Sequence, residues 1–407
     1  MARVILLTDF SEAYARRLLL GISQYAHYAN EAWSLTRLPS TLLDTEGIEK
    51  VIEYARKLKT DAVIGQFRSI DELERLHEHG IIPIAQDFQI RFDNFPNIVG
   101  NHYLTGKMAA EHFVSKGFRS FAFYGPRDRI FSSERFKGFK DTVAALSPES
   151  TFYSLRPSDS NVWEYDFEEL SSWLMYLPKP VAVMAADDNW AYYVTEACHL
   201  TKAEFPNADV SIPENVAIIG VDNDETICNL SSPNLSSIDQ DVESGGFKVA
   251  KLISSMLNGE IKTMENVLVM PTNIVTRQSS DIYINADNNI TKVLKFIHAN
   301  ITRKLSVEDV VAQVPLSRRL LETKFRENMG TSIYDYIINA RIDKMCDLLL
   351  EGKSIKEASS ELGFFDSKNT SRIFKKIKGT TPTEFIRQNR KEKYPSYISR
   401  SNLSRKR

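Results

Sequence analysis

Carboxylate, amide and aromatic side chains follow several short apolar runs in the first 280 residues. Asp187 follows the run 181–185, and Asp222 follows the run 216–221. Such side chains suit a sugar, because carboxylates and guanidinium groups contact paired hydroxyls while an aromatic ring covers the apolar C–H face. Any one aspartate taken alone is better explained as a helix N-cap. The whole set favours a monosaccharide ligand, bound by Asp9, Phe10, Tyr14, Gln66, Phe88, Phe131, Arg135, Trp163, Asp187 and Asp222.

These residues must be positioned by strands and helices that alternate up to about residue 278. The pattern predicts strands over 4–8, 33–38, 61–67, 82–86, 120–124, 152–155, 181–185, 216–221 and 235–238. It predicts amphipathic helices over 12–28, 45–58, 106–116, 135–146, 167–177, 190–202 and 243–257. Nine strands exceed one compact layer, so we expect two α/β lobes. Ligands of parallel sheets bind beyond the carboxyl ends of the strands, where the polar residues lie.

The charges divide the chain unevenly. The formal net charge is −2, but residues 286–407 hold 25 Lys and Arg against 14 Asp and Glu, whereas residues 1–285 hold 26 against 39. A basic module of about 120 residues is therefore joined to an acidic body, as expected when one end of a chain meets a polyanion. The alternative is an ordinary solvated face of Lys and Arg.

The basic module is predicted to be entirely helical. Capping residues and glycines delimit helices at 291–301, 306–313, 317–329, 332–350, 354–362, 366–378 and 381–389. Segment 306–313 with 317–329, and segment 354–362 with 366–378, each form a short helix, a tight turn and a longer basic helix. This is the plan of a helix-turn-helix unit.

The acidic body resembles the effector domain of the lactose- and galactose-repressor group, itself similar to periplasmic sugar-binding proteins. The likeness rests on the run 216–223 and on Ala185-Ala186-Asp187-Asp188, and it covers roughly residues 1–280. It implies that Asp187, Asp222 and Arg135 bind sugar hydroxyls. The amino-terminal DNA-binding headpiece of that group is missing, so DNA binding is expected from the other end.

The basic module resembles the DNA-binding domain of the arabinose-regulator family. The matching residues are Arg341-Ile342, Leu348-Leu349, Ile355, Ala358, Leu362-Gly363-Phe364, Phe374-Lys375-Lys376, Gly379-Thr380-Thr381-Pro382 and Phe385. Asn369, Thr370, Met345 and Pro315 depart from the usual pattern, and Asn369 is expected to alter which base is contacted.

In such domains the exposed sides of the two longer helices contact DNA. Arg suits guanine, Asn suits adenine and Glu accepts from cytosine, whereas lysines at the end of the second helix suit phosphate. The expected DNA-binding residues are Arg319, Glu322, Thr323, Ser367, Lys368, Asn369, Ser371, Arg372, Lys375 and Lys376.

Enzymatic chemistry finds little support in the sequence. It has no GxGxxG after the first strand, no phosphate loop, no GxSxG and no HExxH. Cys198, Cys228 and Cys346 match neither a zinc site nor a redox pair, which indicates a reducing compartment. No apolar run is long enough to span a membrane, and the start lacks a signal-peptide core. We expect a cytoplasmic protein without catalytic residues, cofactor, metal or membrane partner.

The expected fold is therefore a two-lobed α/β domain like periplasmic binding proteins, followed by an all-α domain with two helix-turn-helix units. The expected parts are a sensor and dimerisation domain at 1–280, a linker at 281–290, the DNA-binding domain at 291–390 and a basic tail at 391–407.

The whole chain resembles regulators of xylose operons in enteric bacteria. This implies a xylose-responsive activator that binds double-stranded DNA as a homodimer, with RNA polymerase as a further candidate partner. The sequence leaves open another sugar, such as arabinose or a hexose, and a sugar-independent protein that uses its sensor only for dimerisation. It also leaves open repression instead of activation.

Overall fold

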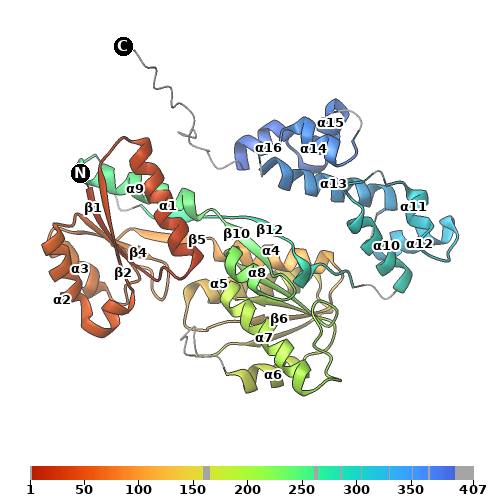
Figure 1. Cartoon of the computed structure of the whole chain (residues 1–407), viewed down its shortest axis with the longest axis horizontal. Coiled ribbons are helices and arrows are strands. Elements are labelled where there is room, and N and C mark those ends of the chain that lie inside the picture. Colours follow the sequence, from red (N-terminus) through yellow and green to blue (C-terminus); the bar gives the residue numbers. More distant parts are fainter. Residues whose placement is uncertain are drawn as a thin grey trace, which may run out of the picture. The chain divides into compact units, whose positions relative to one another are not determined.

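The chain forms two compact units, Met1–Ile282 and Tyr283–Arg407 (Figure 1). The computed structural model describes residues 2–158, 166–260, 265–284, 287–303, 305–329, 331–350, 352–364 and 367–389. The boundary lies close to the point where the net charge changes sign. Each unit has its own buried apolar clusters.

The first unit contains two six-stranded sheets, one in each of two lobes. The first sheet has the order β11-β5-β4-β3-β1-β2, and its paired strands are parallel. The second has the order β12-β10-β9-β8-β6-β7, and only β12 pairs antiparallel to its neighbour. The strands of the first sheet are β1 (Ala2–Leu7), β2 (Trp33–Leu38), β3 (Ala62–Gly65), β4 (Ile82–Gln86), β5 (Asn97–Gly100) and β11 (Val267–Val269). Those of the second are β6 (Ser120–Tyr124), β7 (Thr151–Leu155), β8 (Val181–Ala185), β9 (Val216–Val221), β10 (Ser236–Gln240) and β12 (Pro271–Val275).

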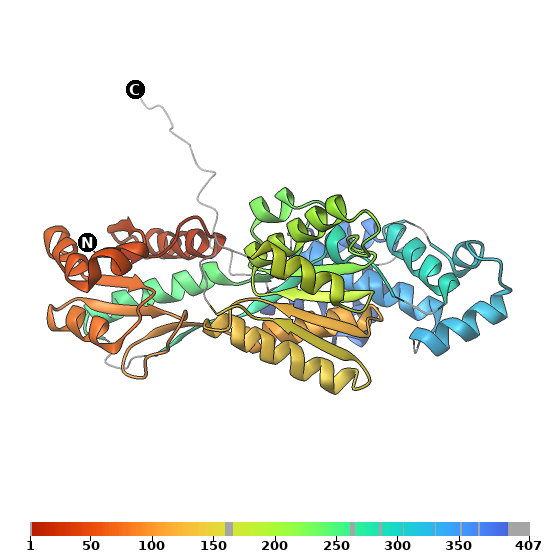
Figure 2. The ribbon, with the colours of Figure 1, turned by 90° about the horizontal axis from the view of Figure 1, so that it is seen from below.

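Helices cover both sheets, and the chain passes between the lobes after β5, after β10 and after β11. The helices are α1 (Ala13–Tyr28), α2 (Thr41–Leu58), α3 (Ile70–Glu78), α4 (His102–Ser115), α5 (Ile130–Leu146), α6 (Phe167–Tyr176), α7 (Asp188–Glu204), α8 (Glu225–Leu230) and α9 (Val242–Leu257). Because the chain returns after β10, α9 lies beside α1 with the first lobe; it is labelled in Figure 1 and is the green helix left of centre in Figure 2. The late strand β11 is thereby built into the first sheet beside β5, although the strands of the second lobe separate the two in sequence.

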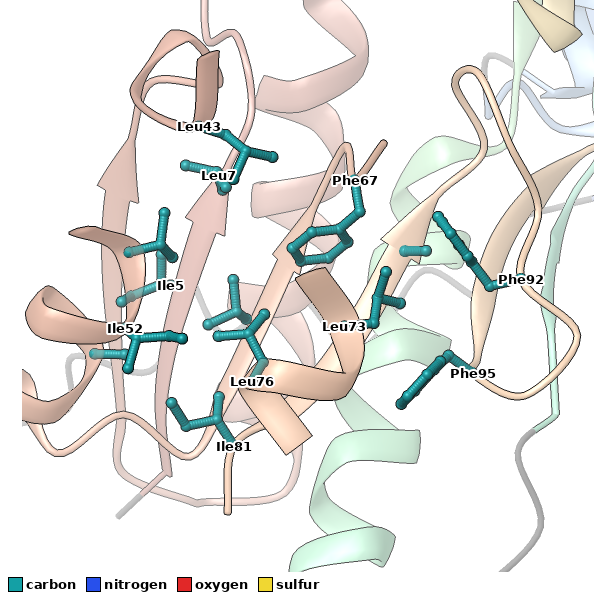
Figure 3. Packing of buried hydrophobic residues seen from close by; sticks show 14 residues of the cluster. Ile5, Leu7, Leu43, Ile52, Phe67, Leu73, Leu76, Ile81, Phe92 and Phe95 are labelled. Atoms are coloured by element: carbon teal, nitrogen blue, oxygen red, sulfur yellow. The ribbon is translucent and has the colours of Figure 1, made fainter. Parts of the chain in front are cut away.

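One apolar cluster fixes the carboxyl end of β1, from which the candidate site begins. Ile5 and Leu7 point from β1 toward Leu43 and Ile52 of α2 (Figure 3). Leu7 is completely buried. Burial of a side chain of this size stabilises the fold by about 1.5 to 3 kcal/mol, so the residues that follow Leu7 start from a rigid base.

The predicted two-lobed α/β fold is confirmed, but three strands were missed. The strand Asn97–Gly100 begins with a polar residue that is 2% exposed. Its amide nitrogen donates to the carbonyl oxygens of Phe92 and Phe95 (2.8 Å each), so a side chain typical of a loop closes a buried turn. The strand Val267–Val269 has only three residues, and the strand Pro271–Val275 begins with proline at the edge of its sheet.

The second unit is helical, as the sequence predicts. Its helices are α10 (Asn288–Ala299), α11 (Val307–Val311), α12 (Arg318–Met329), α13 (Ile333–Leu350), α14 (Ile355–Glu361), α15 (Ser367–Lys378) and α16 (Pro382–Asn389). One cluster packs α10, α11 and α12 against the start of α13, and another packs α14, α15 and α16 against its end. Helix α10 begins at Asn288, inside the segment 281–290 expected to be a linker. Tyr283 stacks on His298 of α10 with ring centroids 4.5 Å apart.

Candidate effector site and DNA-reading helices

Asp222 lies at the carboxyl end of β9, in a turn with left-handed backbone. Its φ is 96° and that of Asn223 is 50°, a region that residues other than glycine seldom adopt. The Asp222 amide donates to the carbonyl oxygen of Ile238 (2.9 Å), and Gln240 Nε2 donates to Asp222 Oδ1. Arg135 Nη2 lies 3.6 Å from the same oxygen. Among the described residues, Asp222 Oδ2 has no hydrogen-bond partner, so it is available to a ligand hydroxyl.

Asp187 and Asp188, at the end of β8, have different roles. Both oxygens of Asp188 accept hydrogen bonds within the second lobe, from the Ser237 hydroxyl (2.6 Å) and the Asp224 amide (2.7 Å). Asp187 is the N-cap of α7. Burial and the charge of Asp222 raise the pKa of Asp187 to about 6. Asp187 is therefore the candidate ligand contact, whereas Asp188 holds the sheet edge together.

Arg135, on the buried side of α5, completes the second lobe's contribution. Its side chain is 3% exposed. Nη1 donates to the carbonyl oxygen of Ala186 (2.5 Å), and the guanidinium carbon lies 5.1 Å from the centroid of the Phe131 ring. Among the described residues, Arg135 Nε, Ser132 Oγ and Gln240 Oε1 are buried without a hydrogen-bond partner. Buried polar atoms are nearly always paired, so these three atoms indicate where ligand hydroxyls would bind.

Residues just before and at the start of α1 contribute the first lobe's ionisable groups to the candidate effector site. Burial, together with the carboxylates of Asp187, Asp222 and Asp9, raises the pKa of Glu12 to about 8. Burial and the charge of Asp222 raise the pKa of Tyr14. Charges act on a pKa over short distances, so Glu12 lies near Asp9, Asp187 and Asp222, and Tyr14 lies near Asp222.

The remaining predicted ligand residues are placed less closely. The guanidinium carbon of Arg37 lies 5.7 Å from the centroid of the Phe10 ring. Gln66 is half-buried directly after β3. The Phe88 ring lies 4.2 Å from the guanidinium carbon of Arg129, and its carbonyl accepts from the first amide of α5 (2.9 Å). Phe88 thus contacts the start of the helix that carries Arg135. Trp163 lies outside the described residues.

Sequence reasoning missed Glu12 and Gln240. It also missed a network of ion-paired side chains beside the site. Asp87 is bound by Arg91 through both oxygens (3.0 and 2.7 Å), and Arg91 also binds both oxygens of Glu134 on α5 (2.7 and 2.8 Å). The signal for Glu12 was its place three residues after Asp9, directly before a helix. No local signal marked Gln240, because its partner lies 18 residues away.

Two arginines of α1 bridge the lobes at this site. Arg16 Nη2 donates to Asp224 (2.8 Å). Arg17 donates to the carbonyl oxygens of Asp222 (3.3 Å) and Gln240 (2.8 Å). The backbone that positions Asp222 is therefore held from the first lobe as well as the second.

In the helical unit, side-chain caps fix the start of each short helix. Ser306 with Asp309 and Ser354 with Glu357 form reciprocal capping boxes, as the sequence predicts. Each cap satisfies amides that would otherwise lack partners. The two helix-turn-helix units are thereby delimited, with α12 and α15 as their second helices.

The expected base-contacting residues of α12 lie on its outer surface, but one of them, Glu322, is already ion-paired. Arg319 and Thr323 are exposed, and the Thr323 hydroxyl donates to the carbonyl oxygen of Arg319 (3.0 Å). The Glu322 carboxylate instead accepts from Arg318 Nε (3.0 Å). Glu322 would have to leave this ion pair to accept from a base.

The expected surface of α15 is exposed where its side chains are described. Asn369 and Arg372 are exposed and linked at 3.3 Å (Asn369 Oδ1 to Arg372 Nη2). Lys375 and Lys376 are exposed and Ser371 is half-buried. Ser367 and Lys368 begin the helix, but their side chains lie outside the described part. Asn369 and Arg372 thus form a pair of donors and acceptors suited to a base edge.

The described residues contain no cluster of His, Cys, Asp or Glu suited to a metal ion. Within the same part of the chain, no helix is long and apolar enough to cross a membrane.

Comparison with known proteins supports both units. Residues 110–280 match the model of a periplasmic binding protein-like domain, and residues 310–388 match a helix-turn-helix domain. The xylose operon regulatory protein of Escherichia coli strain K12 is 25% identical over 392 residues, which cover 94% of this chain and 96% of that protein. The protein of the same name in Haemophilus influenzae is 26% identical over 395 residues, which cover 94% of this chain and 97% of that protein.

Solved structures show the same fold. A structure described as that of the xylose-binding transcription activator xylR matches 96% of this chain and 98% of its own with a TM-score of 0.56 at 24% identity. A regulator of the LacI family from Enterococcus faecium, solved with bound ribose, matches 69% of this chain and 98% of its own with a TM-score of 0.55 at 22% identity. At these identities the likeness establishes the fold.

The two matched domains and the full-length relatives together indicate a transcription regulator that joins a periplasmic-binding-protein-like domain to a helix-turn-helix domain. Over nearly its full length, the chain is homologous to xylose operon regulatory proteins. The predicted resemblance to regulators of xylose operons is confirmed.

Proposed function

We propose that this chain is a cytoplasmic, non-enzymatic activator of genes for pentose use, with xylose as its effector. The observation that carries the proposal is the set of buried polar atoms around Asp222 and Arg135, which a sugar's hydroxyls would satisfy. The names of the full-length relatives favour xylose among the pentoses. The motifs of common enzyme classes are missing from the sequence, which supports a binding role.

DNA binding rests on the second unit. Exposed Arg319, Asn369, Arg372 and Lys376 lie on the second helices of two helix-turn-helix units. Two such helices joined by α13 suit two major grooves about one turn apart on one face of the duplex. A homodimer would double this footprint, and an activator would then present a surface to RNA polymerase.

A panel of sugars tests the sensor. D-xylose, L-arabinose, D-ribose and D-glucose are added to the full chain, and unfolding is followed by tryptophan fluorescence, because all four tryptophans lie in residues 1–282. A sugar at 100 times its dissociation constant stabilises by about 2.7 kcal/mol. D-xylose should stabilise most, Asp222→Ala should abolish the effect, and Asp71→Ala, an exposed control on α3, should retain it.

The effect of sugar on DNA binding is tested with DNA duplexes that the wild-type chain selects from a random pool. D-xylose should change the affinity of the full chain for the selected duplex. Stabilisation by another sugar alone would reassign the effector. Stabilisation by none, with DNA binding intact, would favour a sugar-independent protein that uses its first unit for dimerisation.

A further inference from the structure

The last segment of the sensor, residues 277–282, is bound into the second lobe by polar contacts. It contains one turn of 3-10 helix (Gln278–Ser280), and the next unit begins at Tyr283. Ser279 and Ser280 are completely buried, and Ile282 is 5% exposed. A segment that leaves one unit for another is more often exposed and free of such contacts, so its attachment requires an explanation.

Arg277 connects this segment to the turn that carries Asp222. Its Nη2 donates to Asn223 Oδ1 (2.8 Å) and its Nη1 to the carbonyl oxygen of Leu235 (2.8 Å). Its backbone amide donates to Ser236 Oγ (2.8 Å). The left-handed backbone at Asp222 and Asn223 is costly for residues other than glycine and persists only where its surroundings hold it. Arg277 is one of the groups that hold it.

The serines that follow are bonded to the strands below them. Ser279 Oγ donates to the carbonyl oxygen of Ile218 in β9 (2.7 Å) and accepts from the amide of Ser236 (2.8 Å). Ser280 Oγ donates to Ser236 Oγ (2.8 Å). A displacement of β9 or of the start of β10 is thus transmitted directly to the segment.

A second connection runs from Arg135 through α4. A Cβ at Gly106 would overlap the carbonyl oxygen of Arg135, so α4 and α5 touch at this point without intervening side chains. At the other end of α4, His112 Nε2 lies 3.2 Å from Ser280 Oγ and Lys116 Nζ lies 3.6 Å from Asp281. Both candidate effector contacts, Asp222 and Arg135, therefore reach the same segment by short rigid routes.

We propose that residues 277–281 are the output latch of the sensor, and that Arg277 couples the Asp222–Asn223 turn to the chain that enters the DNA-binding unit. The proposal rests on the proposed sugar response. A ligand contact at Asp222 favours one geometry of the turn, because a ligand shifts an equilibrium only through unequal contacts with its two states. Arg277 transfers that preference to the latch. Sugar binding and sugar response are then separable functions.

Arg277→Lys in the full chain tests the latch, because lysine keeps the charge but cannot bond Asn223 and Leu235 in the same geometry. Arg119→Lys is the matched control. Arg119 also contacts a carbonyl oxygen (3.4 Å) and a side-chain hydroxyl (3.1 Å), but it precedes β6, which β8 and β9 separate from β10. The first measurement is hydrogen exchange without sugar. Arg277→Lys should speed exchange in peptides over 222–226 and 277–284, and Arg119→Lys should not.

The second measurement uses D-xylose and the selected duplex. Allosteric coupling typically changes affinity by about 5- to 150-fold; the change should persist in Arg119→Lys and fall below about twofold in Arg277→Lys. Arg277→Lys should still be stabilised by D-xylose. Unchanged exchange in both peptides, or a sugar response equal to wild type, would overturn the latch. A wild type that ignores D-xylose would refute the proposed effector, while the exchange comparison would still decide the latch.

Discussion

Glu12→Gln offers a quantitative test of the site geometry. Glu12 precedes α1 without a side-chain capping bond, and it faces Asp187 and Asp222 from the other lobe. Burial and these negative charges raise its pKa from 4.5 to about 8. Glutamine has nearly the same shape and no charge, so the substitution removes both the cost of burying a carboxylate and its repulsion by the two aspartates.

The sign of the effect follows from proton binding. Between pH 4.5 and about 8 the folded state holds a proton on Glu12 that the unfolded state has released. The free energy of unfolding therefore falls as the pH rises through this window. One pKa unit corresponds to about 1.4 kcal/mol, so the rise to about 8 sets a ceiling of about 5 kcal/mol on the cost of ionising Glu12. Water entry and local rearrangement reduce this cost, and we expect about 2 to 3 kcal/mol.

Urea unfolding of the full chain at pH 5 and pH 9, followed by tryptophan fluorescence, measures the effect on the sensor alone. Glu12→Gln should stabilise the chain by about 2 to 3 kcal/mol at pH 9, and by about 1 kcal/mol or less at pH 5, where most of the penalty is still absent. The control is Glu53→Gln, whose side chain is 68% exposed on α2. An equal effect at both pH values would show that neither burial nor the two aspartates raise the pKa of Glu12.

Two further predictions concern packing and DNA recognition. Gly106→Ala should lower the free energy of unfolding by about 1 to 3 kcal/mol, because its Cβ would overlap the carbonyl oxygen of Arg135; a loss below about 0.5 kcal/mol in the same urea assay would contradict the close approach of α4 and α5. Arg319→Ala and Arg372→Ala should each cost about 1 to 3 kcal/mol on the selected duplex and much less on random DNA, whereas Lys376→Ala should weaken both alike. Gel shifts with both duplexes measure these losses, and equal losses for all three variants would argue against base contact.

The helical unit was the most predictable part, because its signals are local. Ser306 and Ser354 each lie three residues before the acidic partner of a capping box, and Gly363 and Gly379 end helices with a φ of 71° and 75°. Each of these features depends on a few neighbouring residues. The strand Asn97–Gly100 had no such signal, since the burial of its first side chain depends on the tertiary structure.

The site was predictable as a set of strand ends but not as a set of contacts. Asp187, Asp222 and Asp224 have similar sequence contexts, and each could cap a helix. The structure separates them: Asp187 and Asp224 cap α7 and α8, whereas Asp222 is held in a left-handed turn. The groups that hold this turn come from Arg17, 205 residues away, and from Arg277 through Asn223. Because the chain crosses repeatedly between the lobes, these contacts form only when both lobes are complete, and no local pattern records them.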